Sequence, residues 1–402
     1  MIGDVDRTLV LGLGGTVDYE LTWDSSVFDR LAHAHGVRRH ELTTTAPITD
    51  ERSLLVAVLA FVASGAGAER FVASSEVIEA FVSHFTYAVT LGGTGVRAGL
   101  VLDAFGISSV QHLVSIDDNV RRLLPESISY ICSATDDTLD PHLIVQYPVG
   151  AHVRLTDGDV LSPAPNRLIF ANDPPNRRML LAADLPVALA DAGVFLVSGF
   201  NTMQDHDLLE LRLAEVHRAM RSLPSDALVY YEDAGFYTRD FAETVRARLL
   251  PQIDVYGMNE DELQEYLGRS VNLLDTADVV RALREVHMII PARALVVHTR
   301  YWAIAVGPDA ARHRAALDSA VRVAATRYRV GDALTAAEVD RTATMTRHGG
   351  GEALVVAVED ALPDALGIAA FSLDVASPTT IGLGDTFVGG FLAGTVRAKE
   401  DA

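Results

Sequence analysis

The sequence predicts an α/β fold with a central, mostly parallel sheet that is flanked by helices. Short apolar runs rich in β-branched residues alternate with longer stretches of helical periodicity, which is the pattern of βαβ units. A length of 402 residues with 49% hydrophobic residues is enough for one large α/β body and an insert. The expected strands are, in chain order, Thr8–Gly12, Ser109–Val114, Val194–Ser198, Ala227–Glu232, Val255–Gly257, Ala294–His298 and Leu354–Val358.

Helical periodicity fills most of the chain between these strands. Thr335 and Glu338 have the spacing of a capping box, which predicts one further helix after them. The other expected helices are Asp50–Ala63, Glu76–Phe85, Thr94–Ala104, Asp205–Ser222, Thr238–Leu250, Asn259–Leu267, Thr276–Val286, Leu317–Tyr328 and Thr386–Val396.

Two stretches interrupt this alternation and predict a small β lid that is inserted in pieces. Residues 18–47 are polar and show no clean helix, and residues 126–178 contain short alternating segments separated by Pro, Gly and Asp. We therefore expect the lid to comprise 18–47 and 126–178, and the large α/β domain to comprise 1–17, 48–125 and 179–402. The alternating segments are Ser129–Ser133, His142–Tyr147, Val153–Thr156 and Arg167–Ala171.

The charge of the chain argues against two classes of partner. The 33 basic and 54 acidic residues give a formal charge of −21, whereas nucleic acids and anionic membranes require a basic surface. A small phosphorylated ligand needs only a few local donors and stays possible. The longest apolar run, Leu54–Ala63, is ten residues and too short for a membrane span. With a single cysteine (Cys132) and no basic segment before the first apolar run, we expect a cytoplasmic protein without disulfides.

The segment Gly382-Leu383-Gly384-Asp385 is the strongest chemical motif. Its glycines allow a tight turn with converging N–H groups, and the helix that follows adds its positive dipole end, so the segment can hold an anion without basic side chains. Asp385 could accept a proton from an attacking hydroxyl group beside that anion hole. The alternative is that Asp385 only caps the helix.

Three other segments carry candidate residues. Asn259 and Glu262 have capping-box spacing, and Glu262 is also placed to organise Mg²⁺ and its waters. Gly92 and Gly93 precede a helix and either let a ligand approach the backbone or serve a tight connection. The glycines before Asp18 lack the third glycine of a dinucleotide fingerprint, so Asp18 is a candidate for binding sugar hydroxyl groups.

Together these segments resemble the ADP-dependent glucokinase and phosphofructokinase family of the ribokinase-like superfamily. Gly382–Asp385 is similar to the family's terminal G-x-G-D, and Asn259–Glu262 to its N-x-x-E. Three further segments match in family order, so the resemblance extends from Asp18 to Asp385. They are Asn166–Asn172, Val197–Phe200 and Val297–Arg300.

The resemblance implies an ADP-dependent carbohydrate kinase, a glycolytic transferase that uses ADP as phosphoryl donor and Mg²⁺ as cofactor. Its acceptor would be glucose or fructose 6-phosphate, and its product AMP. Asp385 would be the catalytic base and the amides of Gly382, Leu383 and Gly384 the anion hole. The remaining roles implied are nucleotide binding by Arg167, Asn259 and His298, acceptor binding by Asp18, Gly92 and Gly93, and metal binding by Glu232 and Glu262.

This sequence departs from the family pattern mainly on the acceptor side. Gly14 and Thr16 stand where the family has Asn, Thr94 stands where it has Gln, and Gln146 where it has Glu. On the metal side, the His of the family's H-x-E is replaced by Tyr230. The departures keep two alternatives open, an ATP-dependent kinase of the same superfamily and a nucleotide- or sugar-binding protein with little activity.

The choice of acceptor and the oligomeric state stay open at this stage. A sugar phosphate requires a cationic clamp, and the lid region contains basic residues that could form one or could simply be solvated. These residues are Arg154, Arg177, Arg178, His142 and His152. A dehydrogenase would rest on the glycines Gly12–Gly15 alone.

Overall fold

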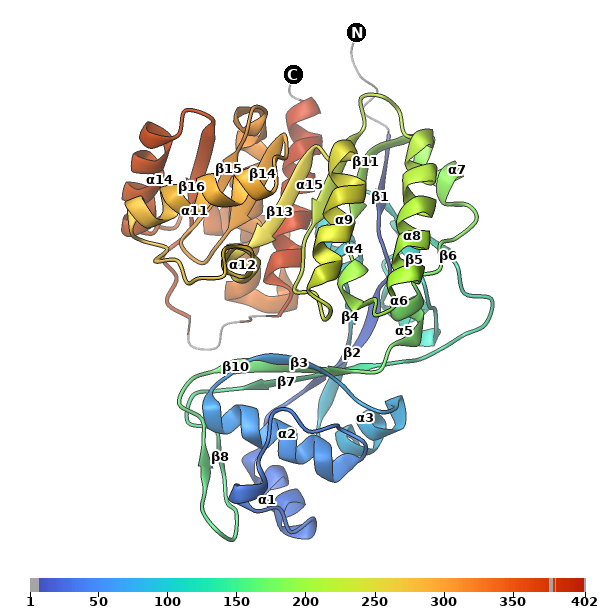
Figure 1. Cartoon of the computed structure of the whole chain (residues 1–402), viewed down its shortest axis with the longest axis vertical. Coiled ribbons are helices and arrows are strands. Elements are labelled where there is room, and N and C mark those ends of the chain that lie inside the picture. The colour runs from blue at the N-terminus through green and yellow to red at the C-terminus, as the bar shows by residue number, and fades with distance from the viewer. Residues whose placement is uncertain (1–6, 376–378, 380, 401–402) are drawn as a thin grey trace.

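The computed structural model describes residues 7–375, 379 and 381–400. The chain forms a larger and a smaller unit, each built on its own sheet (Figure 1). The expected α/β class, with a mostly parallel sheet between helices, is confirmed. Within the described residues, nine strands form the larger sheet, and β1, β5, β6 and β11–β14 run parallel in it. In sheet order they are β16 (Ala365–Ala369), β15 (Trp302–Val306), β14 (Ala294–His298), β13 (Val255–Asn259), β12 (Leu228–Glu232), β11 (Ala192–Val197), β1 (Thr8–Leu11), β5 (Ser109–Leu113) and β6 (Ile128–Cys132).

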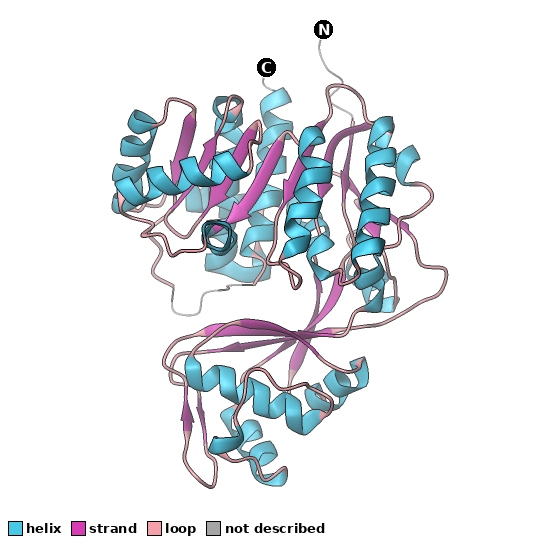
Figure 2. Cartoon of the chain, in the orientation of Figure 1, coloured by secondary structure: helices cyan, strands magenta, loops and turns pink. Residues whose placement is uncertain are grey.

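Helices cover both faces of the larger sheet (Figure 2). Their apolar sides pack on strands that are buried on both faces, as parallel strands in α/β proteins usually are. One face is covered by α7 (Leu185–Leu189), α8 (His206–Ala219), α9 (Asp240–Leu249), α11 (Thr276–Ile289) and α14 (Gly349–Ala361). The other is covered by α4 (Thr94–Ala104), α12 (Arg314–Val330) and α15 (Leu383–Glu400). The helices α5 (Asp118–Leu123), α6 (Pro174–Arg178), α10 (Glu260–Leu267) and α13 (Ala336–Ala343) complete the larger unit, and α13 starts at the predicted cap, Thr335.

The smaller unit is a five-stranded sheet, counted over the described residues, and it forms the lid (Figure 1). Three helices pack on one face of this sheet, and the other face is turned toward the larger unit. The strands, in sheet order, are β3 (Ala68–Phe71), β10 (Asn166–Ala171), β7 (His142–Tyr147), β2 (Thr16–Leu21) and β4 (Tyr87–Gly92). The helices are α1 (Ser25–Ala34), α2 (Glu51–Ser64) and α3 (Ser75–Val82), and a short hairpin of β8 (His152–Val153) and β9 (Val160–Leu161) extends from the sheet.

The strand pairing corrects the expected domain boundaries. Residues 51–92, which were expected in the larger domain, supply α2, β3, α3 and β4 of the lid. They belong there because β4 pairs antiparallel with β2 and the apolar side chains of α2 fill the lid core. Conversely β6, which was expected in the lid, pairs with β5 at the edge of the larger sheet.

Two secondary-structure predictions were also wrong. Leu354–Val358 lies in the middle of α14 and is not a strand, since its buried residues follow a helical period and His348 caps the helix. The helix α1 occupies part of the stretch where no helix was expected. Its buried residues Val27, Phe28, Leu31 and Ala32 have helical spacing that the polar residues between them conceal, and Asp24 caps its start.

Candidate active site

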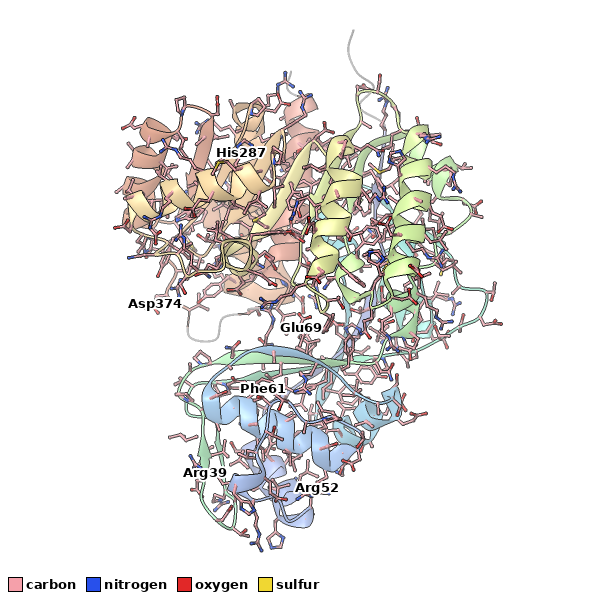
Figure 3. The ribbon with its side chains drawn as sticks, in the orientation of Figure 1. Arg39, Arg52, Phe61, Glu69, His287 and Asp374 are labelled. Carbon is pink, nitrogen blue, oxygen red and sulfur yellow. The ribbon has the colours of Figure 1, made fainter. Side chains whose placement is uncertain are left out.

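A cleft with a volume of about 800 Å³ lies between the two sheets. One wall is formed by the carboxyl ends of strands of the larger sheet, together with the start of α15. Ligands of open α/β sheets bind at this edge because the loops after parallel strands converge there. The opposite wall is the face of the lid sheet, and Glu69 of β3 lies on it between the two units (Figure 3).

The glycine-rich segment forms the predicted turn at the start of α15. Gly382 has a φ of +64°, and its carbonyl accepts a hydrogen bond from the Thr386 N–H (2.9 Å). The N–H groups of the first helical turn have no partner within the helix, which makes this position suited to an anion. The buried Arg327 of α12 fixes the turn from behind, since its Nε donates to the Ile381 carbonyl (2.9 Å).

Asp385 projects from the first turn of α15 into the cleft. The helix begins at Leu383, so Asp385 is a residue of the first turn and does not cap it. Its Oδ2 lies 3.9 Å from Nε of Arg97, a residue of α4. The same guanidinium donates from Nη2 to Oδ2 of Asp18 (3.0 Å), so the structure brings the two predicted acid groups to one point. Asp18 lies within β2 and is buried.

The glycines expected on the acceptor side have separate positions. A Cβ on Gly92 would lie 2.3 Å from Oδ2 of Asp18. The carboxylate of Asp18 therefore packs directly against Gly92, which does not line the cleft. Gly93 lines the cleft with a φ of +89°, and its Cβ would lie 3.0 Å from Cα of Gly15. Close packing of the β1–β2 and β4–α4 connections therefore requires glycine at both positions.

Glu232 and His298 form a buried pair on the body wall. They stand at the carboxyl ends of β12 and β14, and His298 Nε2 lies 2.9 Å from Glu232 Oε1. Burial raises the pKa of Glu232, and the charge of Asp385 raises it further against the opposing effect of His298. Burial lowers the pKa of His298, but the hydrogen bond and charge of Glu232 outweigh it and the net shift is upward.

The second oxygen of Glu232 lies near the hydroxyl of Tyr230. Apart from each other, neither Glu232 Oε2 nor the hydroxyl of Tyr230 has a hydrogen-bond partner within the described part of the chain, and the hydroxyl lowers the pKa of Glu232. Both atoms lie against Gly257, where a Cβ would come within 2.0 Å of the carboxylate and 2.4 Å of the hydroxyl. Tyr230 thus lies beside the carboxylate of Glu232.

The capping box at the start of α10 is confirmed. The Asn259 N–H donates to Glu262 Oε2 (2.8 Å), while Asn259 Oδ1 accepts from the N–H groups of Asp261 and Glu262. Burial raises the pKa of Glu262 to about 8, and the charges of Asp233 and Glu232 add to the shift. Capping therefore uses one carboxylate oxygen of Glu262. A role in capping and a role in holding Mg²⁺ are both compatible with this arrangement.

These carboxylates suit a divalent cation that is shared with a phosphorylated ligand. Mg²⁺ is usually held by one or two carboxylates, with water and phosphate oxygens as its other ligands. Glu232 and Glu262 line the same wall, and His298 uses only one of the two carboxylate oxygens of Glu232. Over the residues described, no group of three or more His, Cys, Asp or Glu side chains is arranged to hold a metal ion by itself.

Sequence reasoning missed Asp233, which follows Glu232 and also lines the cleft. Its buried Oδ2 accepts hydrogen bonds from the hydroxyls of Tyr256 (2.8 Å) and Tyr266 (2.6 Å). The available signal was its position at the end of a strand beside a predicted site residue. It was also missed that Arg97 joins Asp18 to Asp385, because nothing in the order of the chain places these residues together.

The lid wall brings one predicted cation into the cleft. Arg167 of β10 lines it, opposite Gln146 in the β10–β7 register. Among the five basic residues considered for a phosphate clamp, His142 lines the cleft, and its Nε2 lies 3.0 Å from Asp173 Oδ2. Arg154 is instead exposed and bound to Asp29.

The fold and the position of the site define the class of protein first: a ribokinase-like α/β protein with a β lid. A phosphofructokinase from Pyrococcus horikoshii OT3 with AMP superposes with a TM-score of 0.78, at 16% identity over 98% of this chain and 99% of that chain. An ADP-dependent kinase in complex with fructose-6-phosphate and ADPβS gives 0.72 at 13% identity, over 98% and 95%. An adenosine kinase from Sinorhizobium meliloti gives 0.53 at 12% identity, over 97% and 88%.

The chain belongs to the family of ADP-specific phosphofructokinases and glucokinases. The model of the ADP-specific Phosphofructokinase/Glucokinase conserved region matches residues 7–349. This confirms the predicted family, although the match ends before the turn that contains Asp385. No curated protein sequence matches the chain. None of the helices described is both long enough and apolar enough to cross a membrane.

Proposed function

We propose that the protein transfers the β-phosphoryl group of ADP to a hydroxyl group of a hexose or hexose phosphate and releases AMP. The observation that carries this proposal is the meeting of Asp385 and Asp18 at one guanidinium inside one cleft. A base at an anion-binding helix start and a carboxylate suited to hydroxyl groups are the two parts that such a transfer needs. The family membership and the related kinase with fructose-6-phosphate and ADPβS support the same class of ligands.

In this proposal Asp385 takes the proton of the acceptor hydroxyl group as its oxygen attacks the phosphoryl group. The amides of Gly382, Leu383 and Gly384 stabilise the charge of that group, because they point to its place before the reaction begins. Asp18 orients the acceptor. Arg167 reaches across from β10 to the diphosphate, for which a planar guanidinium is well suited, while Asn259 and His298 flank the nucleotide at the ends of β13 and β14.

A divalent cation such as Mg²⁺ would neutralise the diphosphate charge when bound, with Glu232 and Glu262 as the residues that hold it, directly or through water. The acidic surface of the protein does not oppose this function. Backbone amides and one arginine would bind the diphosphate locally, so the net charge of −21 is compatible with a nucleotide ligand.

A panel of nucleotides and acceptors tests the proposal. AMP formation is measured with ADP and Mg²⁺ and with glucose, fructose 6-phosphate and other sugars, and ATP replaces ADP in a parallel set. We expect turnover with ADP that disappears on chelation of the cation. Turnover with ATP and none with ADP would contradict the proposal. Binding of ADP without turnover of any acceptor would identify a binding protein, the alternative that the acceptor-side departures keep open.

A further inference from the structure

Arg97 is a buried cation that contacts both units of the protein. Its side chain extends from α4 of the body, and Nη2 donates to Asp18 of the lid strand β2 at 3.0 Å. The same nitrogen lies 3.5 Å from Oε1 of Glu20, and Nε lies 3.9 Å from Oδ2 of Asp385. One guanidinium therefore links the proposed base to the proposed acceptor-binding carboxylate, although these two residues stand near opposite ends of the sequence.

The stem of Arg97 also packs against the anion-binding turn. A Cβ on Gly382 would lie 2.6 Å from Cδ and 3.0 Å from Nε of Arg97, so a larger residue in the turn would displace the arginine. The helix α4 is held at this place by close packing of Gly95, where a Cβ would lie 3.2 Å from the Gly12 nitrogen. The backbone of Arg97 is therefore held in place by the packing of α4, and its side chain is held in place by the turn at Gly382.

The charges around Arg97 explain why it stays ionised in a buried position. Burial disfavours the charged form, but Asp18, Asp385 and Glu20 outweigh burial and raise the pKa of Arg97. A guanidinium presents donors along two edges in one plane, so it can orient two carboxylates at a fixed separation. A lysine ammonium group, which is a point charge on a flexible stem, cannot fix both directions.

We propose that Arg97 is a positioning residue that couples acceptor binding at Asp18 to the orientation of the base Asp385. The inference rests on the proposed function, because it assigns Asp385 and Asp18 the roles given there. An acceptor that binds Asp18 changes the contact between Asp18 and the guanidinium, and the same guanidinium orients Asp385. Acceptor binding therefore aligns the attacking hydroxyl group and its base together. Arg97 itself does not touch the nucleotide in this account.

Replacement of Arg97 separates this role from a merely structural one. In Arg97→Ala we expect kcat to fall about 100-fold, the size of effect that a misplacement of about 1 Å produces. KM for the acceptor rises and KM for ADP stays within about twofold, since the nucleotide contacts are intact. Arg97→Lys recovers little of kcat. Millimolar guanidinium restores activity to Arg97→Ala by filling the vacated position, and methylammonium does not.

Arg212→Ala is the matched control. Arg212 is also buried and pairs with Glu215 at 2.7 Å on α8, outside the cleft, so its loss should lower thermal stability and leave both KM values and kcat unchanged. The positioning role is contradicted if Arg97→Ala keeps wild-type kcat, or if KM for ADP and for the acceptor rise equally without rescue by guanidinium.

A double-mutant cycle on unfolding keeps the inference testable if the wild type shows no turnover. Asp18→Asn and Asp385→Asn are combined in the wild-type and Arg97→Met backgrounds, and midpoints of denaturation are compared. We expect the two aspartates to be energetically coupled in the first background and additive in the second. Additivity in both backgrounds overturns the proposed link, whereas coupling without turnover overturns the proposed function alone.

Discussion

The two walls of the cleft are built from different parts of their sheets. On the body wall the site residues stand where strands end: Glu232 at the end of β12, Asn259 at the end of β13 and His298 at the end of β14. Asp385 stands in the first turn of α15. On the lid wall they stand in the middle of strands. Along β2, Val17, Tyr19 and Leu21 fill the lid core, and the intervening Asp18 is turned to the cleft.

The difference shows how each wall is encoded. A connection from a strand end to a helix needs glycines and capping residues in consecutive positions, so short sequence motifs encode the body wall. A sheet face takes every second residue from several strands, so the lid wall has no motif and depends on register. The arginine that spans both walls, Arg97, belongs to neither pattern. Each of the following substitutions changes a residue of one wall.

The largest effect is expected for the base on the body wall. Asp385→Asn keeps the shape of the side chain and removes the proton acceptor, so kcat should fall about 10²- to 10⁴-fold. ADP affinity, measured by calorimetry, should change little because the amides of the turn remain. A loss of ADP binding equal to the loss of turnover would show that Asp385 serves the nucleotide and not the proton.

Glu262→Gln separates the two roles of this body-wall residue. Glutamine can replace glutamate in a capping box, so the free energy of unfolding should change by less than about 0.5 kcal/mol. Glutamine has no carboxylate to offer the cation, so the half-saturating Mg²⁺ concentration should rise about 10- to 100-fold. In Glu262→Ala the Asn259 N–H also loses its acceptor, at a cost of about 1 kcal/mol. An unchanged Mg²⁺ dependence in the glutamine variant would leave capping as the role of Glu262.

Gly92→Ala acts on the lid wall alone. The new methyl group would lie 2.3 Å from Oδ2 of Asp18 and from Oγ1 of Thr16, so Asp18 must move. Overpacking of this kind destabilises the fold by about 1 to 3 kcal/mol. The displaced Asp18 should raise the KM for the acceptor and leave the KM for ADP unchanged. Gly349→Ala, at an open position of α14, is the control and should match the wild type. Equal changes in both KM values would refute the separation of the walls.

The smallest effect concerns the charge of His142 on the lid wall. Burial lowers the pKa of His142, but its hydrogen bond to Asp173 and nearby carboxylates outweigh burial and raise it above the ordinary 6.5. The charged pair therefore stabilises the fold below pH 6.5, and this contribution of about 1 kcal/mol is lost as the pH rises through the folded-state pKa.

Denaturant unfolding of wild type and His142→Gln from about pH 6 to pH 9 measures this loss. The stability difference between the two proteins should shrink as the pH rises. A difference that stays constant, or grows, would show that His142 is neutral throughout.

The parts of the molecule that could be predicted are those with local determinants. The G-x-G-D turn, the Asn259–Glu262 cap and most body helices follow from residues that are adjacent in the chain. The helix α1 was missed because polar residues conceal the helical spacing of its apolar residues. The assignment of α2, β3, α3 and β4 to the lid could not be predicted, since the pairing of β2 with β4 decides it. Arg97 and Asp233 were missed for the same reason. Their partners come from other elements, and only the folded chain brings them together.

The central claim is that the two walls cooperate to move a phosphoryl group from ADP to a sugar. The most direct test uses ADP labelled with ³²P at the β position, with Mg²⁺ and either glucose or fructose 6-phosphate. We predict that the label appears in the sugar product in equal amount to AMP, and that Asp385→Asn abolishes this transfer. The account is contradicted if the label stays in ADP, is released as inorganic phosphate, or reaches the sugar only from the γ position of ATP.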